Sequence, residues 1–326
     1  MVYFLFFLGF VILIVGANKL IEGAASIGEH LGLSQVVVGL TIVAVGTSLP
    51  ELFINLFAAV KGNTDLAIGN ILGSNIVNTY LIVGVAALIY PITVSKRTAE
   101  RLIPGTILAT AVLYLLANDD IFGRPATKIG RIDGVVLLLL FVAFLYYVVL
   151  RQDVNDKVAS EELEIKKLPI FKSILFILVG VAGLYFGGDW IVTGAEQIST
   201  DLDISQSVIG LTIVALATSL PELVTSILSA RKKNSALAIG NAVGSNIINI
   251  FFVLGITAVI RPIPFKTSLN FEIIMVIIAS SLLLLVVKIT GKKKNTITRL
   301  EGLFLIAAYI GFLIFNAFGR EWLQHF

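Results

Sequence analysis

Two glutamates carry the clearest chemistry in this sequence. Glu51 and Glu222 each end a Thr-Ser-Leu-Pro-Glu run, and long apolar stretches surround both runs. A carboxylate at membrane depth costs about 2.5–3.5 kcal/mol on insertion scales, so it marks a functional site. Each proline also removes a backbone donor, which leaves the carbonyls of Gly46 and Ala217 without their helical partner. Hydroxyl, carbonyl and carboxylate oxygens together are ligands suited to Ca²⁺ and Na⁺. A simple proline kink explains the hydroxyls but not the carboxylates.

A second polar run, Gly-Asn-x-x-Gly-Ser-Asn, follows each carboxylate. Glycines four residues apart let helices approach closely, and packing accounts for the glycines. It does not account for the amides and hydroxyls. Ser74 and Asn78 share one helix face because they are four residues apart, and Ser245 and Asn249 do the same. We predict that these side chains line an ion path beside the two carboxylates.

Both motifs belong to an internal repeat. Residues 39–84 align without a gap with residues 210–255, and 26 of the 46 positions are identical. We therefore predict a first five-helix repeat at 1–150 and a second at 170–326, joined by a charged cytoplasmic linker at 151–169.

Composition places this repeat in a lipid bilayer. The chain is 57% hydrophobic and 14% charged, with a mean hydropathy of +0.97, and a soluble surface needs more charge than this. The sequence contains no cysteine, which excludes thiolate metal sites, and His30 and His325 match no metal-ligand spacing. We predict no resident cofactor, no nucleic-acid partner and no obligate protein partner.

Hydrophobic runs predict ten membrane helices, so the expected fold class is an all-α polytopic membrane protein. The predicted helices are 2–28, 35–61, 66–90, 99–117, 132–150, 170–199, 206–231, 237–260, 271–289 and 299–318. Loops on one side carry 16 Lys and Arg residues, and loops on the other side carry 7. The positive-inside rule places the richer side in the cytoplasm and both termini outside the plasma membrane. The second and seventh helices then run in opposite directions, which makes an inverted-topology repeat.

The two motifs resemble those of the cation/calcium exchanger superfamily, whose repeats carry GTSLPE and GNxxGSN, and the chain is most similar to the prokaryotic sodium/calcium exchangers. The resemblance covers nearly the whole chain. It implies that the second, third, seventh and eighth helices form an ion-binding core, against which the long first and sixth helices slide. The proton/calcium branch of the superfamily carries an acid in a GNxxE-type motif, and both runs here lack that acid.

The resemblance also implies a shared site for the transported Ca²⁺ and Na⁺, built from both repeats. Its ligands are the carbonyls of Ala44 and Ala215 and the side chains of Thr47, Ser48, Glu51, Ser74, Asn78, Thr218, Ser219, Glu222, Ser245 and Asn249. Two positions depart from the family pattern. Some archaeal members have aspartate in place of Asn249, and Ala217 replaces the first glycine of the second GTSLPE motif. Potassium-dependent relatives carry an acid at one or both asparagine positions, which argues against potassium coupling.

The charge of the site suggests how exchange is coupled. Glu51 and Glu222 supply at most −2, which one Ca²⁺ or two Na⁺ neutralise, and a third Na⁺ leaves +1. Two like charges about 6 Å apart repel by about 3 kcal/mol at an effective dielectric of about 20. An empty site is therefore expected to bind protons, or the protein is expected not to pass between its inward-open and outward-open states. We expect Na⁺/Ca²⁺ antiport by alternating access and no enzyme activity, because no nucleophile–base pair is evident. H⁺/Ca²⁺ antiport at the same carboxylates is the alternative, and a cation channel is a more distant one.

Overall fold

The structure, a computed structural model, describes residues 1–31, 44–96, 98–118, 128–150, 167–290 and 295–316, which are mostly helical. The α-helices before the linker are α1 (Val2–His30), α3 (Ala44–Thr47), α4 (Leu49–Lys61), α5 (Thr64–Ile76), α6 (Val83–Ile89), α7 (Ile103–Ala117) and α8 (Arg131–Leu150). Those after it are α9 (Ile170–Leu202), α10 (Gln206–Ile209), α11 (Ala215–Thr218), α12 (Leu220–Arg231), α13 (Ser235–Ile248), α14 (Leu254–Ile260), α15 (Asn270–Leu285) and α16 (Arg299–Ile314).

Short π-helical segments continue several of these helices, and a 3₁₀ turn, Thr267–Leu269, precedes α15. The π-helical segments are Val77–Ile82, Thr98–Leu102, Gly210–Val214, Asn249–Val253 and Val286–Thr290. Two small antiparallel pairs of strands join connections that are far apart in sequence. They pair β1 (Ile92–Thr93) with β4 (Thr296–Ile297), and β2 (Lys128–Ile129) with β3 (Ile263–Pro264).

Several of these helices are long and apolar enough to cross a membrane. Within the described residues six helices qualify, and a seventh span is added when the bent pair Gln206–Thr218 and Leu220–Arg231 is taken as one. The six are Val2–His30, Thr64–Ile89, Thr98–Ala117, Ile170–Leu202, Ser235–Ile260 and Thr267–Lys288. Helices α4, α8 and α16 lie within the other three predicted segments and are not among these spans. Residues 35–43 and 151–166, parts of a predicted helix and of the predicted linker, lie outside the described residues.

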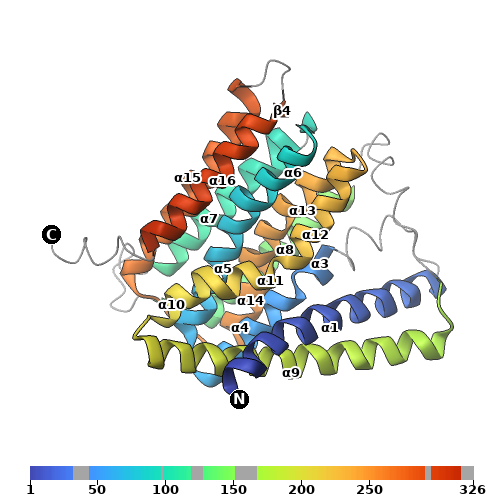
Figure 1. Cartoon of the computed structure of the whole chain (residues 1–326), viewed down its shortest axis with the longest axis vertical. Helices are drawn as coiled ribbons and strands as arrows, with labels where there is room; N and C mark the ends of the chain where they lie inside the picture. Colours follow the sequence, from blue (N-terminus) through green and yellow to red (C-terminus); the bar gives the residue numbers. More distant parts are fainter. Residues whose placement is uncertain (32–43, 97, 119–127, 151–166, 291–294, 317–326) are drawn as a thin grey trace.

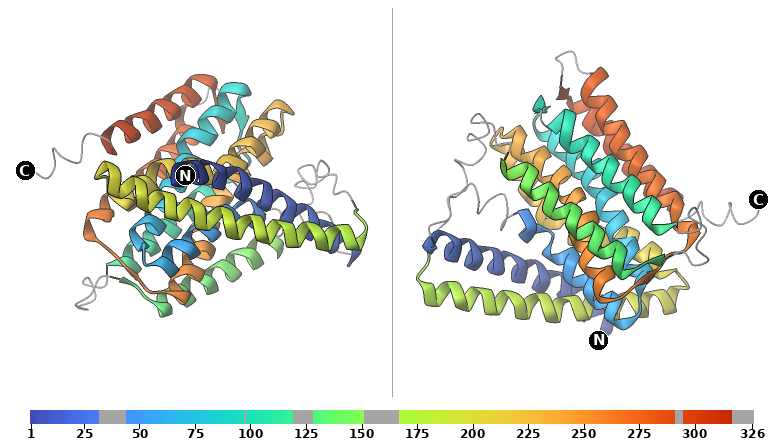
Figure 2. Two further views of the ribbon diagram at one scale, coloured as in Figure 1. Left: turned by 60° about the horizontal axis from the view of Figure 1, so that its bottom comes forward. Right: turned by 180° about the vertical axis from the view of Figure 1, so that it is seen from behind.

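The two longest helices, α1 and α9, pack antiparallel along their length and lie across one end of the bundle (Figures 1 and 2). Glycines make this close approach possible. A Cβ on Gly9 would lie 3.0 Å from the carbonyl oxygen of Gly187, and one on Gly16 would lie 2.9 Å from that of Gly180. Seven residues separate the glycines in each helix, which keeps them on nearly the same face. The interface is therefore a backbone-to-backbone contact of the kind that small residues allow in membranes.

The remaining long helices form a bundle in which segments from before and after the linker alternate. Helix α8 packs against α14, α16 against α6, and α15 against α7. Glycines also occur at two of these crossings. A Cβ on Gly134 would lie 2.7 Å from the carbonyl oxygen of Gly255, and one on Gly84 would lie 2.8 Å from that of Gly302. The largest apolar core lies inside this bundle, and a smaller one lies between the α1–α9 pair and the bundle.

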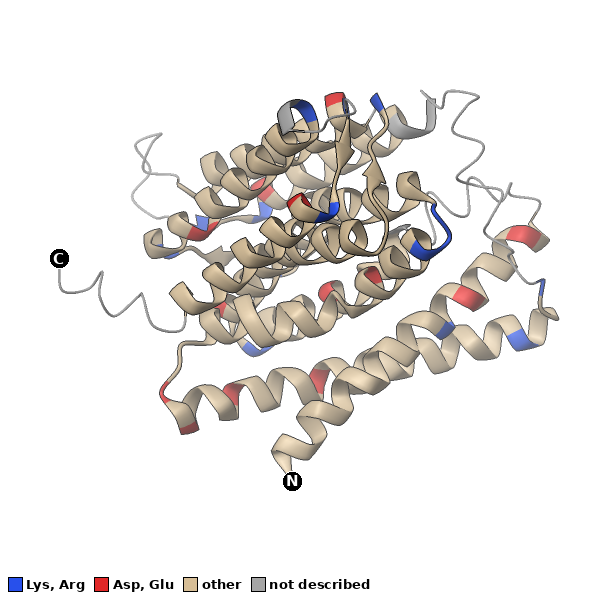
Figure 3. Ribbon diagram, turned by 45° about the horizontal axis from the view of Figure 1, so that its top comes forward, with Lys and Arg blue, Asp and Glu red and all other residues tan. Residues whose placement is uncertain are grey.

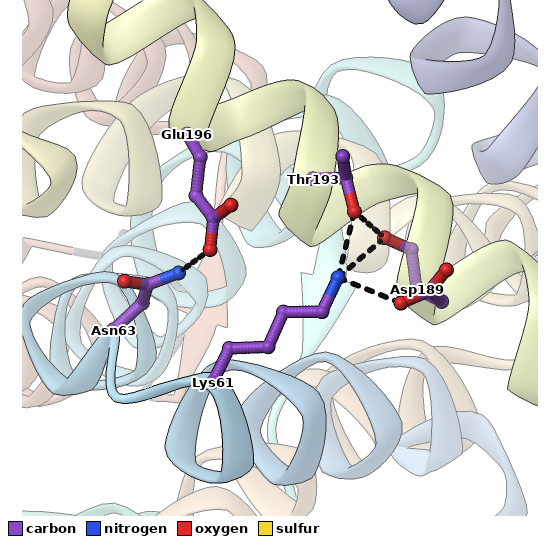
Figure 4. A network of polar contacts seen from close by, with 5 residues as sticks. All are labelled: Lys61, Asn63, Asp189, Thr193 and Glu196. Atoms are coloured by element: carbon purple, nitrogen blue, oxygen red, sulfur yellow. Dashed lines mark hydrogen bonds and ion pairs between the residues drawn. The ribbon is translucent and has the colours of Figure 1, made fainter.

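Most Lys and Arg positions lie at helix ends or in connections, as expected for a chain in a bilayer (Figure 3). One polar network links the end of α4 to α9 (Figure 4). The Nζ of Lys61 lies 2.6 Å from Oδ1 of Asp189 and donates to Oγ1 of Thr193, also at 2.6 Å. Asn63 donates to Glu196 beside it. These contacts attach the α1–α9 pair to the bundle at the end of α4.

Candidate cation site

The chain breaks its helices at both Thr-Ser-Leu-Pro-Glu motifs. Ser48 separates α3 from α4 and Ser219 separates α11 from α12, with similar backbone angles (φ −89°, ψ 8° and φ −82°, ψ 5°). Pro50 and Pro221 stand in the first turn of the helix that follows, where a missing N–H costs nothing. The second break bends the chain by 44°. The sequence predicted one helix over 206–231, whereas the structure divides it at the serine.

The breaks place each glutamate in the first turn of a new helix. Glu51 lies near the start of α4 and Glu222 near the start of α12, and both side chains have 0% exposure. The N-terminal end of a helix carries partial positive charge, which favours a carboxylate there. Neither glutamate faces lipid or solvent.

Hydroxyls from both copies of the repeat surround Glu51. Its Oε1 accepts from Ser74 at 3.4 Å, a residue of its own copy, and from Ser219 at 3.2 Å, a residue of the other copy. Thr218 stands beside this pair, 3.4 Å from the Ser74 hydroxyl, and donates to Oδ1 of Asn70 at 3.1 Å. The two motifs therefore meet at this carboxylate.

Glu222 has the corresponding neighbours. Ser245 of its own copy donates to its Oε1 at 3.4 Å, and Thr47 of the other copy makes a side-chain hydrogen bond with it. Glu51 is close enough for the two carboxylates to repel each other. The structure thus brings Glu51 and Glu222 into one buried group with the serines and threonines of both motifs.

Several buried polar atoms of this group make no hydrogen bond within the described part of the chain. They are Oε2 of Glu51, Oε2 of Glu222, Oγ of Ser48, both amide atoms of Asn78 and Oδ1 of Asn249. Buried polar atoms in proteins are nearly always paired, so a group of unpaired ones needs an explanation. Nearly all of these atoms are oxygens of the kind that coordinate Ca²⁺ or Na⁺. No group of three or more His, Cys, Asp or Glu side chains suited to a metal occurs among the described residues, so any cation here relies on neutral oxygens as well.

The two predicted carbonyl ligands are located at the start of the short helices before each break. The carbonyl of Ala215 accepts from the Ser219 N–H at 3.1 Å and lies 3.3 Å from the Thr218 hydroxyl, whose single proton is shared with Oδ1 of Asn70. A carbonyl oxygen has two lone pairs, and both of these contacts lie at the break between α11 and α12. Ala44 is the first residue of α3.

Two features of the site were not predicted from the sequence. Asn78 lies in the π-helical segment Val77–Ile82, and Asn249 begins the segment Asn249–Val253. Such segments often occur at functional sites, since the extra residue redirects side chains. The second feature is a set of amide contacts between the copies, through Asn75 and Asn246, whose only signal in the sequence is that both copies contain them.

Three other charged residues in the long helices α1 and α9 form ion pairs away from the two glutamates. Lys19 and Glu22, three residues apart, form an ion pair at 2.9 Å in α1. Asp189 pairs with Lys61 in the network of Figure 4. Neither pair belongs to the buried group around the two glutamates.

Comparison with known proteins identifies the family of this chain. A family model described as sodium/calcium exchanger protein matches residues 1–150 and 172–318. The sodium/calcium exchanger MaX1 of Methanosarcina acetivorans is 32% identical over an alignment of 348 positions, gaps included, which covers 96% of this chain and 97% of that protein. The membrane protein MJ0091 of Methanocaldococcus jannaschii is 33% identical over 306 residues, which cover 94% of each. The solved structure of the sodium-calcium exchanger NCX_Mj matches with a TM-score of 0.63 and 31% identity, over 95% of this chain and 96% of that chain. The chain is therefore a multi-pass membrane transporter that belongs to the sodium/calcium exchanger family.

Proposed function

We propose that this protein is a secondary antiporter that exchanges Na⁺ for Ca²⁺ by alternating access. The transported ions bind at one buried site between the two copies of the repeat. The proposed ligands are the carbonyls of Ala44 and Ala215 and the side chains of Thr47, Ser48, Glu51, Ser74, Asn78, Thr218, Ser219, Glu222, Ser245 and Asn249.

One observation carries this proposal. Two fully buried carboxylates from opposite copies each keep one oxygen without a hydrogen bond within the described residues, and hydroxyls of both copies surround them. Two carboxylates buried without cations are costly because they repel each other in a medium that screens poorly. One Ca²⁺ or two Na⁺ would cancel their charge, so both ions compete for the same oxygens.

The family match supports an arrangement of ten membrane helices in two inverted repeats. The family model matches residues 1–150 and 172–318, and we assign the two halves to 1–150 and 170–326 around a linker at 151–169. In this arrangement both termini lie outside the plasma membrane, and the α1–α9 pair slides against the core as the site opens to each side in turn. Inverted repeats make the two open states near mirror images.

The relatives favour Na⁺ as the coupling ion. MaX1 and NCX_Mj are both named as sodium/calcium exchangers, and both align with nearly the whole of this chain. The alternative is H⁺/Ca²⁺ antiport, because the same two carboxylates can bind protons in place of Na⁺. The acid of the GNxxE-type motif is missing from both runs of this chain, which favours Na⁺ over H⁺.

Reconstitution into sealed proteoliposomes tests the proposal. Vesicles loaded with Na⁺ and diluted into Na⁺-free medium containing radiolabelled Ca²⁺ are expected to take up Ca²⁺, with K⁺ present or absent. Glu51→Gln and Glu222→Gln should each abolish this uptake, since each removes one of the two charges that hold Ca²⁺. Uptake driven by a pH gradient but not by Na⁺ would establish the H⁺/Ca²⁺ alternative. Uptake at the wild-type rate in both variants would refute the site.

A further inference from the structure

Asn75 lies between the two copies of the repeat and contacts Asn249, one of the proposed ligands. The Nδ2 of Asn249 donates to Oδ1 of Asn75 at 3.3 Å, and both side chains are fully buried. An asparagine amide presents oxygen on one side and nitrogen on the other, and only the oxygen can bind a cation. Whatever fixes the orientation of Asn249 therefore decides whether this residue attracts or repels an ion.

The orientation of Asn75 is itself fixed by a group that cannot be reversed. Its Nδ2 donates to the backbone carbonyl of Asn246 at 3.4 Å, and a carbonyl can only accept. The Oδ1 of Asn75 must then face Asn249, and it accepts a hydrogen bond from Nδ2 of Asn249. This leaves Oδ1 of Asn249 turned away, buried and without a hydrogen bond in the described part of the structure.

The equivalent amide of the other copy is not held in this way. Thr79 donates its hydroxyl proton to the carbonyl of Asn75 at 2.8 Å and accepts from Nδ2 of Asn246 at 2.9 Å. Asn246 therefore donates to a hydroxyl, whereas Asn75 donates to a backbone carbonyl. Among the described residues, neither amide atom of Asn78 has a partner. The residue equivalent to Thr79 in the second copy is Ile250, which has no hydroxyl to stand between Asn75 and the carbonyl of Asn246.

We propose that Asn75 is a positioning residue of the cation site, which holds Asn249 so that its carbonyl oxygen, and not its amide nitrogen, faces the bound ion. This inference rests on the proposed function, because it assigns a role within the same site. Asn249 is then a ligand oriented before the ion arrives, which lowers the cost of ordering it on binding. Asn78 must be ordered by the ion itself.

Calorimetric titration of the purified full-length protein with CaCl₂ in Na⁺-free buffer tests the inference. Asn75→Ala removes the acceptor for Asn249 and is expected to weaken Ca²⁺ binding about tenfold, the worth of one well-placed hydrogen bond. Asn249→Asp provides the second background, since a carboxylate presents oxygen in either orientation. There, Asn75→Ala is expected not to weaken Ca²⁺ binding, because no amide is left to orient and the Asn75 oxygen that would face the carboxylate is removed.

The matched control is Asn118→Ala. Asn118 is a buried asparagine that exchanges two amide hydrogen bonds with Asn270, between α7 and α15, outside this network. Its substitution should leave Ca²⁺ affinity unchanged. If Asn75→Ala does not yield folded protein, Asn75→Leu keeps the side-chain volume and makes the same test.

The outcomes separate this inference from the function on which it rests. Equal affinity in Asn75→Ala and wild type overturns the positioning role. Equal weakening by Asn75→Ala in the wild-type and Asn249→Asp backgrounds overturns it too, because a loss by general packing does not depend on that amide. A wild-type protein that binds no Ca²⁺ overturns the proposed function and the inference together.

Discussion

At the scale of single residues, the repeat places equivalent side chains in unequal surroundings. Asn249 is held by an amide from the other copy, whereas the side-chain amide of Asn78, its counterpart, makes no hydrogen bond to any described residue. We attribute the difference to one hydroxyl. Thr79 donates to the backbone carbonyl of Asn75, and Asn246 donates to the Thr79 hydroxyl in place of that carbonyl. If the site binds one Ca²⁺ or several Na⁺ as proposed, this asymmetry would let one amide of the pair stay fixed while the other adapts to each ion.

We predict that Thr79→Ile makes the two amides alike. Isoleucine stands at the equivalent position 250, and it keeps the β-branched shape of threonine while removing the hydroxyl. Asn246 should then donate to the carbonyl of Asn75 and accept from Asn78, which raises Ca²⁺ affinity about two- to tenfold in calorimetric titration.

Thr110→Ile serves as the control for Thr79→Ile. Its hydroxyl is likewise buried and donates to the carbonyl four residues back, at 2.8 Å, within α7. The control should leave Ca²⁺ affinity unchanged. An unchanged affinity in Thr79→Ile as well would show that Asn78 needs no partner.

The residue types of the site were predictable, and their pairing was not. Membrane-depth carboxylates stand out in any apolar sequence, and repetition identified which serines and threonines accompany them. Which amide contacts which depends on the distance between helices of opposite copies, and no local pattern of Asn75 or Asn246 encodes that distance. Glu272, fully buried near the start of α15, was not singled out, since it stands close to a predicted helix end and outside both repeated motifs.

At the scale of elements, the functional helices are interrupted where the ions are proposed to bind. A proline follows Ser48 and Ser219 by two residues, so the breaks at these serines could be anticipated from the sequence. The π-helical segments at Val77–Ile82 and Asn249–Val253 could not, because one extra residue per turn leaves the apolar character of the run unchanged. Long apolar runs therefore predicted where helices lie but not where they are divided.

The glycine contacts between α1 and α9 make a prediction at this scale. Gly187→Ala places a Cβ 2.7 Å from the carbonyl oxygen of Gly9 and must push the two helices apart. We expect the free energy of unfolding to fall by about 1–3 kcal/mol, the usual cost of overpacking, seen as a lower melting temperature in detergent.

Gly311→Ala is the matched control for Gly187→Ala. No described atom lies within 4 Å of a Cβ at this glycine of α16. The melting temperature should stay the same or rise, because alanine favours a helix more than glycine does. Similar losses in both variants would mean that α1 and α9 do not depend on their close contact.

At the scale of the whole molecule, the α1–α9 pair is a long unit that meets the bundle through the smaller apolar core and a few polar contacts. Lys61, Asp189 and Thr193 join it to α4 on one side of the molecule (Figure 4). Partly exposed ion pairs of this kind contribute about 0–1 kcal/mol, little enough to break and re-form during transport. The contact is thus suited to a unit that moves as a whole.

Cross-linking tests whether this unit moves. The sequence has no cysteine, so Lys61→Cys with Thr193→Cys can be joined by a bifunctional thiosulfonate without a side reaction elsewhere. We expect the joined protein to lose Na⁺-driven Ca²⁺ uptake and to regain it on reduction. Tyr3→Cys with Asp201→Cys, which joins α1 to α9 where their side chains already meet, should leave uptake intact. Continued uptake by the first cross-linked protein would contradict the proposed sliding.

The alternation of helices in the bundle has a consequence for biosynthesis. Helices α6 and α8 leave the ribosome early, yet the helices that cover their glycine faces, α16 and α14, are made after the linker. Until those helices are made, the two glycine faces lack the partners that they have in the complete fold. Helix α16 is made after the linker and packs against α6, so this part of the bundle can close only after α16 has been synthesised.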